Sequence, residues 1–168
     1  MMHLKNFKRI LLVNPKLVFP KSVYSDDYSD YEGAGSFDQK SINIGLLAVA
    51  SYIDMLNHEV QILDLQDSLD DVHDLLNFVN QYSPHYIGIS CNSCYAYTKT
   101  VDYVATLRDH NCNQFIFAGG QHIGAIADTA MQEIPQLDCI VKYEGELPVR
   151  FILENNAKYL DRIPGLVY

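Results

Sequence analysis

The sequence has little positive charge. Its 168 residues include 12 lysines and arginines against 21 aspartates and glutamates, which gives a formal net charge of −9 at pH 7. A nucleic-acid surface needs clustered cations, and so does attraction to an anionic membrane. No apolar run approaches the roughly 20 residues of a spanning helix, and the short run 10–13 cannot form the core of a signal peptide. We therefore expect a cytoplasmic protein that binds neither nucleic acid nor a membrane.

Nucleotide-binding signatures are also missing. Neither a Gly-x-Gly-x-x-Gly fingerprint nor a P-loop follows the first predicted strand, and the connection there, residues 16–43, is far longer than a phosphate-binding turn. The four cysteines indicate no disulfide framework, and the chain has no internal repeat. Its length and its 48% hydrophobic content are those of one domain with a sizeable core.

The chain does contain apolar runs that alternate with segments of helical periodicity. The expected strands are residues 8–13, 59–63, 85–90, 114–118 and 138–142. The expected helices are residues 44–57, 69–82 (capped by Ser68), 97–111, 124–134 and 147–155. Parallel strands joined by helices form a doubly wound sheet with right-handed crossovers. The sequence therefore predicts an α/β, flavodoxin-like (Rossmann-like), doubly wound five-stranded parallel sheet in the order 2-1-3-4-5.

Small and polar residues follow three neighbouring strands of this predicted sheet, in segments 90–92, 119–122 and 143–146. Ligands of open α/β sheets bind in the crevice beyond the carboxyl ends of the strands. A serine hydroxyl at a strand end can donate a hydrogen bond to a planar ligand, and two glycines let a ligand tail pass against the backbone. The three segments therefore predict one binding site. A tight strand-to-helix turn is the alternative reading of the glycines alone.

Seven stretches, in chain order, resemble the N-terminal cobalamin-binding domain of B12-dependent radical SAM enzymes. They are Asn14-Pro15 and residues 45–52, 58–64, 87–90, 119–122, 143–146 and 163–168. Each stretch is a weak signal, whereas the ordered set is specific, above all Gly-Gly-x-His and Gly-Glu at the fourth and fifth strand ends. The resemblance implies a flavodoxin-like fold that holds cobalamin above the carboxyl edge of the sheet, with the dimethylbenzimidazole tail displaced and threaded between sheet and helices.

The resemblance also implies residue roles. Ser90 would contact the tail, and Gly119 and Gly120 would line its slot. The other expected cofactor-binding residues, several of them near the corrin ring or its amide side chains, are Asn14, Pro15, Gly45, Cys91, Asn92, Ser93, Tyr95, Gln121, His122, Tyr143, Glu144, Gly145 and Glu146. Neither a catalytic residue nor a direct metal ligand is expected in this chain.

The chain departs from the wider cobalamin-carrier family at residues 40–45. Methionine synthase and the mutases carry Asp-x-His-x-x-Gly there, and the histidine becomes the lower axial ligand of cobalt. In this chain Gly45 fits that pattern, but Lys40 and Ile42 replace the acid and the histidine. Neither side chain suits cobalt as a ligand. The resemblance therefore implies tail-off cobalamin without a histidine from this position, an arrangement that should favour methyl transfer.

The second departure concerns the catalytic half of such enzymes. Radical SAM enzymes carry Cys-x-x-x-Cys-x-x-Cys, and this sequence has no such motif. We expect residues 1–160 to form a cobalamin-binding domain that catalyses nothing alone, with residues 161–168 as an exit segment. A separate barrel would hold S-adenosylmethionine and a 4Fe-4S cluster. The whole enzyme would methylate an unactivated carbon or phosphorus centre of a small molecule or peptide.

Other readings of individual residues stay open at this point. Cys91 and Cys94 form a C-x-x-C pair, for which a structural role is favoured over redox chemistry or metal binding. His122 is expected to form hydrogen bonds rather than bind metal, and Glu144 and Glu146 to cap a helix or contact the ligand rather than exchange protons. The remaining histidines are expected on the surface: His3, His58, His73, His85 and His110.

Two further alternatives concern the long loop and the whole chain. The loop tyrosines Tyr24, Tyr28 and Tyr31 could cover the cofactor, or the loop could be mobile and acidic. The fold itself does not assign a function. A flavodoxin-like flavin- or nucleotide-binding protein, or a cofactor-free regulatory or interaction module, would be compatible with the same architecture.

Overall fold

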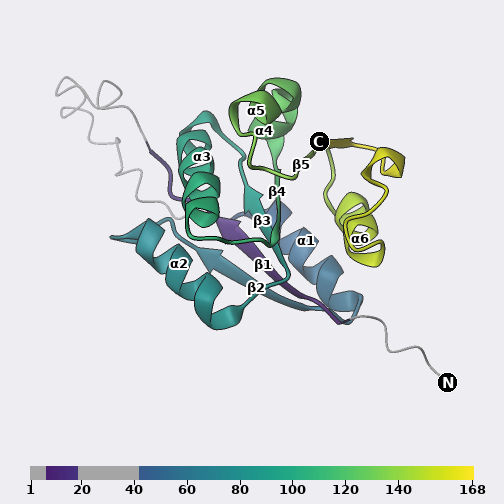
Figure 1. Cartoon of the computed structure of the whole chain (residues 1–168), viewed down its shortest axis with the longest axis horizontal. Helices are drawn as coiled ribbons and strands as arrows, with labels where there is room; N and C mark the ends of the chain where they lie inside the picture. Colours follow the sequence, from purple (N-terminus) through teal and green to yellow (C-terminus); the bar gives the residue numbers. More distant parts are fainter. Residues whose placement is uncertain (1–6, 19–41) are drawn as a thin grey trace, which may run out of the picture.

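A six-stranded sheet with helices on both faces forms the centre of the protein (Figure 1). The computed structural model describes residues 7–18 and 42–168, so Lys40, His3 and the loop tyrosines named above lie outside the described residues. The strands are β1 (Arg9–Asn14), β2 (Glu59–Asp64), β3 (Tyr86–Ser90), β4 (Phe115–Gly119), β5 (Cys139–Val141) and β6 (Leu166–Val167). Their order is β2-β1-β3-β4-β5-β6. The predicted five parallel strands and their order are confirmed.

The helices divide between the two faces of the sheet. They are α1 (Ile44–Met55), α2 (Asp71–Tyr82), α3 (Cys94–Asp109), α4 (Gln121–Ala125), α5 (Ala127–Glu133) and α6 (Glu146–Glu154). The buried side chains of α1 and α6 pack on one face, whereas those of α2 to α5 pack on the other (Figure 1). Within the two described ranges, no helix is both long and apolar enough to cross a membrane.

The central strands are apolar on both sides, as a parallel sheet covered by helices requires. In β1, Ile10 and Leu12 pack with α1 and α6, and Leu11 and Val13 pack with the helices of the opposite face. A Cβ atom at Gly88 of β3 would lie 2.5 Å from the Phe117 ring. The glycine therefore makes room for that ring.

Three local predictions were wrong. The predicted helix 124–134 is two helices, because Gly120, at φ +125°, turns the chain so that α4 begins immediately after β4, and Ile126 then interrupts the helical backbone. Asp70, not Ser68, caps α2, since its Oδ1 accepts a hydrogen bond from the His73 N–H at 3.2 Å. His58 is buried rather than exposed.

The last residues pack back onto the domain. β6 pairs antiparallel with β5, and the Lys142 N–H donates to the Gly165 carbonyl at 2.7 Å. Ile163 is buried in the core between the sheet and the α1 and α6 helices. Part of the expected exit segment, residues 161–168, is thus a sixth strand. The apolar stretch there is too short for the sequence to predict a strand.

A partly buried ion pair joins α2 to α3, and a tyrosine bonded to it reaches the segment after β1. Asp71 Oδ2 accepts a hydrogen bond from Tyr103 Oη at 2.6 Å and lies 2.8 Å from Lys99 Nζ. Tyr103 is fully buried, and its hydroxyl oxygen also accepts from the Lys16 N–H at 3.4 Å. Burial raises the pKa of Asp71, but the hydrogen bonds from Lys99 and Tyr103 and the charge of Lys99 outweigh it, so the pKa lies below its ordinary value of 3.8.

We expect Asp71→Asn to lower the free energy of unfolding by about 2 kcal/mol at pH 7, because charged hydrogen bonds are lost and Lys99 stays behind. A carboxylate whose pKa is lowered by folding stabilises the protein above its unfolded pKa and ceases to do so as the pH falls through the folded pKa. The difference between the two proteins should therefore shrink below about pH 4. Urea unfolding at several pH values measures it. Asp128→Asn, at an exposed position on α5, is the control and should change little.

Candidate functional site

A large cavity lies at the carboxyl edge of the sheet. Its volume is about 1250 Å³, above the usual range for small-ligand pockets. The sheet contributes a floor of small and apolar residues, and the starts of α1, α3, α4 and α6 surround it. The floor residues are Leu12, Gly88, Phe117, Gly119 and Val141. A mostly apolar cavity of this size can enclose a large ligand with a planar group.

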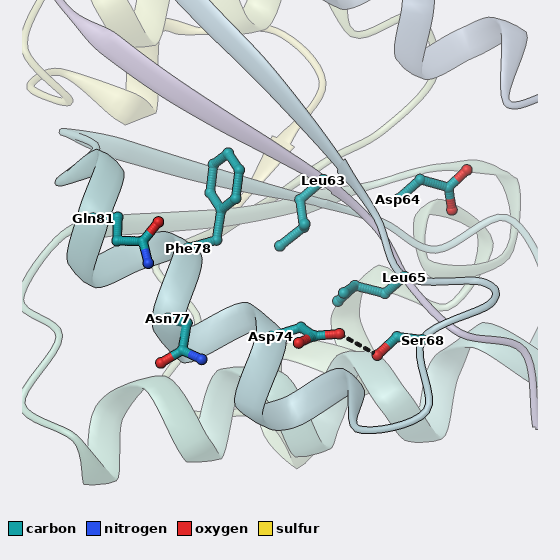
Figure 2. A pocket seen from close by; sticks show the side chains of 8 residues that line it. All are labelled: Leu63, Asp64, Leu65, Ser68, Asp74, Asn77, Phe78 and Gln81. Carbon is teal, nitrogen blue, oxygen red and sulfur yellow. Dashed lines mark hydrogen bonds between the residues drawn. The ribbon is translucent and has the colours of Figure 1, made fainter.

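A second hollow, lined by residues of β2, α2 and the loop between them, is smaller, at about 320 Å³ (Figure 2). The Ser68 hydroxyl donates a hydrogen bond to Asp74 at 2.6 Å, and Figure 2 shows this pair next to Leu65 and away from the Phe78 ring. None of the residues predicted from the sequence to bind a ligand lines it. The large cavity is therefore the candidate site.

The structure brings nearly all of the predicted site residues to the large cavity. Those that line it are Asn14, Pro15, Gly45, Ser90, Asn92, Ser93, Tyr95, Gly119, Gly120, Gln121, Tyr143, Glu144, Gly145 and Glu146. They come from the ends of β1, β3, β4 and β5 and from the helices that follow. Their contact with a cofactor stays a prediction, but their convergence is a property of the fold.

Cys91 does not line the cavity. Its side chain is fully buried in the core under α3, and its Sγ donates weakly to the Ser93 carbonyl at 3.8 Å. Burial raises the pKa of Cys91 to about 11, so the thiol is not a reactive thiolate at neutral pH. Its partner in the C-x-x-C pair, Cys94, is exposed, and all four cysteines are free. The burial of Cys91 favours a structural role for that residue.

His122 does not line the cavity either. Its ring meets the Tyr97 ring edge-on at a centroid distance of 5.7 Å, on the side of α4 that faces α3. The Tyr97 hydroxyl in turn donates to Glu133 of α5. The described part of the chain holds no cluster of three or more His, Cys, Asp or Glu side chains suited to a metal ion. The structure therefore places His122 in helix packing.

A network of side-chain amides crosses the polar edge of the cavity. Asn43 is the N-cap of α1, and its Oδ1 accepts from the Leu46 N–H at 3.0 Å. Its Nδ2 donates to Asn14 Oδ1 at 3.1 Å and to Ser90 Oγ at 2.8 Å. Asn92 Nδ2 donates to Ser90 Oγ at 3.2 Å and to Asn43 Oδ1 at 3.3 Å. The network joins the ends of β1 and β3 to the start of α1.

Asn43 was missed among the site residues predicted from the sequence. The available signal was local, because asparagine directly before a helical periodicity is a common N-cap. That signal indicates where α1 begins, but it does not show that the same side chain reaches two strand ends. Those contacts join residues 29 and 47 positions apart in the chain.

The two adjacent glycines at the end of β4 differ in how much room a side chain would have at each position. A Cβ atom at Gly120 would lie 2.5 Å from Asn92 Oδ1 and 2.7 Å from the Cys91 carbonyl oxygen, and the positive φ disfavours any other residue. A Cβ atom at Gly119 would meet only Val141, at 3.5 Å or more. Gly120 thus shapes the turn, whereas the missing side chain of Gly119 leaves space in the cavity itself.

Apolar side chains stand at the mouth of the cavity. Ile42 and Ile44 are each 75% exposed, and Tyr143 is 84% exposed. Tyr143 has φ 61°, and Lys142 Nζ lies 5.7 Å from its ring centroid. Glu146 lies in the first turn of α6, where its charge suits the helix dipole, but no side-chain hydrogen bond caps that helix.

Comparison with known proteins agrees with these features. A family model described as "B12 binding domain" matches residues 33–153. The uncharacterized methyltransferase PH0819 of Pyrococcus horikoshii is 30% identical over 129 residues, which cover 74% of this chain and 27% of that protein. The crystal structure of a cobalamin-binding protein from Desulfitobacterium hafniense DCB-2 aligns with a TM-score of 0.58 and 14% identity, over 96% of this chain and 60% of that one. The chain thus spans about a quarter of the methyltransferase, and the likeness to the crystal structure concerns the fold.

Thiol reactivity tests the assignment of the cysteines. We expect a thiol-specific reagent at pH 8 to modify Cys94 rapidly in the folded chain and the other three only after unfolding, because burial raises the pKa of Cys91 to about 11 and that of Cys139 to about 12. Mass spectrometry of digested protein identifies the modified residue. Fast modification of Cys91 as well would contradict the structural reading of the C-x-x-C pair.

Gly120→Ala tests the turn between β4 and α4. We expect the free energy of unfolding to fall by about 2 kcal/mol, because a positive φ and a close backbone contact both oppose a side chain. Gly124→Ala is the matched control, since a Cβ atom there would lie 3.7 Å from its nearest neighbour, within a helix. The control should unfold at an equal or higher urea concentration. Equal losses in both variants would contradict the special role of Gly120.

Proposed function

This chain belongs to the B12-binding domain family, and we propose that it is the cofactor domain of a B12-dependent radical SAM methyltransferase. The observation that carries the proposal is the cavity of about 1250 Å³ at the carboxyl edge of the sheet, where the predicted residues of four strand ends converge. A flavodoxin-like sheet offers this edge to its ligands. The proposed ligand is cobalamin, with its nucleotide tail inserted between the sheet and α1.

The interior of the cavity fits a flat tail base. Gly119 has no side chain. A Cβ atom built there would have Val141 as its nearest neighbour, at 3.5 Å or more. The facing wall of α1 contributes Gly45, Ala48 and Val49, all small or β-branched. The tail would lie against the backbone of β4, with the Ser90 hydroxyl within reach of its ring nitrogen. The close approach depends on the absence of a Cβ atom at Gly119.

The mouth of the cavity fits the corrin ring. The proposed contacts of the ring are Ile42, Ile44 and Tyr143, since all three are large, exposed and part of the lining. Isoleucine has no atom that binds a metal, so Ile42 would contact the cofactor without coordinating its cobalt. Cobalamin, when bound, supplies a cobalt centre that carries a methyl group. This chain would hold the ring by apolar contacts at the mouth of the cavity.

One fact supports the methyltransferase part of the proposal, and a second concerns where the cluster would be held. The Pyrococcus horikoshii relative bears the name of a methyltransferase, and most of its length lies outside the aligned segment. The four cysteines of this chain are not spaced to hold a radical SAM cluster. The cluster, S-adenosylmethionine and the small-molecule or peptide substrate would therefore belong to a separate catalytic domain. Iron and sulfide analysis of a longer protein that includes this domain, with an assay of methyl transfer from S-adenosylmethionine, tests that part.

Cobalamin binding is tested by titration of the chain with hydroxocobalamin, followed by desalting and a visible spectrum. We expect about one equivalent to be retained, with a shifted spectrum because the tail leaves the cobalt. Gly119→Val should fold, since valine suits a strand and its Cβ has room, yet it should retain no colour because its side chain fills the slot. Thr98→Val, at an exposed position on α3 outside the cavity lining, is the control and should bind as the unmodified chain does.

An unmodified chain that retains no cobalamin would contradict the cofactor proposal and favour a cofactor-free interaction module. Retention that is equal in the Gly119→Val variant would place the cofactor elsewhere on the protein.

A further inference from the structure

We infer, on the premise of the proposed cobalamin binding, that Asn43 is a positioning residue that directs the hydroxyl hydrogen of Ser90 into the cavity. Both side chains line the cavity, and Ser90 is 8% exposed. Asn43 would thereby decide what kind of atom the tail of the ligand must present. The inference rests on the direction of each hydrogen bond in the amide network.

The direction of the Asn43 amide is fixed by the backbone. The Leu46 N–H can only donate, so the atom of Asn43 that faces it at 3.0 Å must be the oxygen. The NH₂ group of Asn43 then faces Asn14 Oδ1 at 3.1 Å and Ser90 Oγ at 2.8 Å. Its two hydrogens suffice for these two acceptors. Asn43 therefore donates to Ser90 and cannot accept from it.

The same reasoning fixes Asn92. The Gln121 N–H faces Asn92 Oδ1 at 3.3 Å, which leaves the NH₂ group of Asn92 to donate to Ser90 Oγ at 3.2 Å. A serine oxygen accepts two hydrogen bonds and donates one. Both accepting positions of Ser90 are thus occupied, and among the described residues no acceptor is recorded for its hydrogen. That hydrogen is available to a ligand in the cavity.

A carboxylate secures the far end of the network. Asn14 Nδ2 donates to Asp64 Oδ1 at 3.1 Å, so Asn14 presents its oxygen to Asn43. Reversal of either amide would bring two acceptors or two donors face to face, which is costly in a partly buried site. The polarity of Ser90 is therefore set by two backbone N–H groups and one carboxylate, none of which needs to touch the ligand.

This polarity selects the ligand atom. A hydroxyl that can only donate towards the cavity requires an acceptor there, and an unprotonated ring nitrogen of the tail base meets that requirement. A ligand without the tail makes no use of the hydroxyl. The contribution of Asn43 to binding should therefore depend on the tail.

Asn43→Asp separates this role from helix capping. Aspartate caps helices as well as asparagine does, so the bond to the Leu46 N–H survives, but both donors are replaced by an acceptor. The Ser90 hydrogen then turns to the introduced carboxylate. We expect the affinity for hydroxocobalamin to fall roughly tenfold, the value of one hydrogen bond. The affinity for cobinamide, the corrinoid without the nucleotide tail, should stay unchanged.

Three further variants complete the experiment. Asn43→Ser keeps a capping side chain and removes the two amide N–H donors without adding charge, so it should reproduce the tail-dependent loss. Asn80→Asp adds the same charge at an exposed position on α2 and should bind both corrinoids normally. Ser90→Ala should weaken cobalamin binding in the unmodified chain but add no loss to Asn43→Asp, because the two residues act through one hydrogen bond.

The outcomes separate the inference from the proposed function. A loss with Asn43→Asp that is equal for hydroxocobalamin and cobinamide, or a change in thermal unfolding alone, would reduce Asn43 to a helix cap and overturn the inference, while cobalamin binding stands. An unmodified chain that binds neither corrinoid overturns the proposed function and the inference with it.

Discussion

The parallel pairing of β1 with β2 on one side and β3 on the other is the constraint from which the site follows. The chain leaves β1 towards α1 on one face of the sheet, whereas the helices after β2 and β3 cover the opposite face. The connections therefore diverge at the carboxyl ends of the central strands and leave a crevice there. Burial of β1 on both faces holds this arrangement in place. The cavity exists because of topology, before any side chain contacts a ligand.

The hydrogen bonds at the polar edge of the cavity satisfy polar side chains that this topology buries at the strand ends. Asn14 and Ser90 end β1 and β3, and both are buried, so their polar atoms need partners. Asn43 donates a hydrogen bond to the side-chain oxygen of each while it also caps α1. The bonds that start a helix are thus continuous with those that order the binding surface, so the site is positioned by the fold itself.

The strand order and the convergence of the site could be predicted because their signals are local. Apolar runs mark buried strands, and small residues after them mark the carboxyl edge. The contribution of Asn43 could not be predicted, because it depends on contacts to distant strand ends. The inward direction of Cys91 and the burial of His58 also depend on how helices pack. The division of the predicted fourth helix into α4 and α5 at Ile126 could not be predicted either, because the hydrophobic periodicity of the sequence is not interrupted there.

The backbone conformation of Tyr143 lowers the stability of the fold. A tyrosine at φ 61° has a backbone that glycine adopts freely and that costs other residues about 1–2 kcal/mol, and its ring contributes little to the core because it is 84% exposed. Selection for stability alone would replace it with glycine or asparagine. A random library screened only for thermostability should therefore enrich substitutions at this position, whereas the corrin contact proposed for Tyr143 predicts that a library screened for cofactor retention keeps the aromatic ring. The contrast between two such screens would map where stability and function compete in this domain.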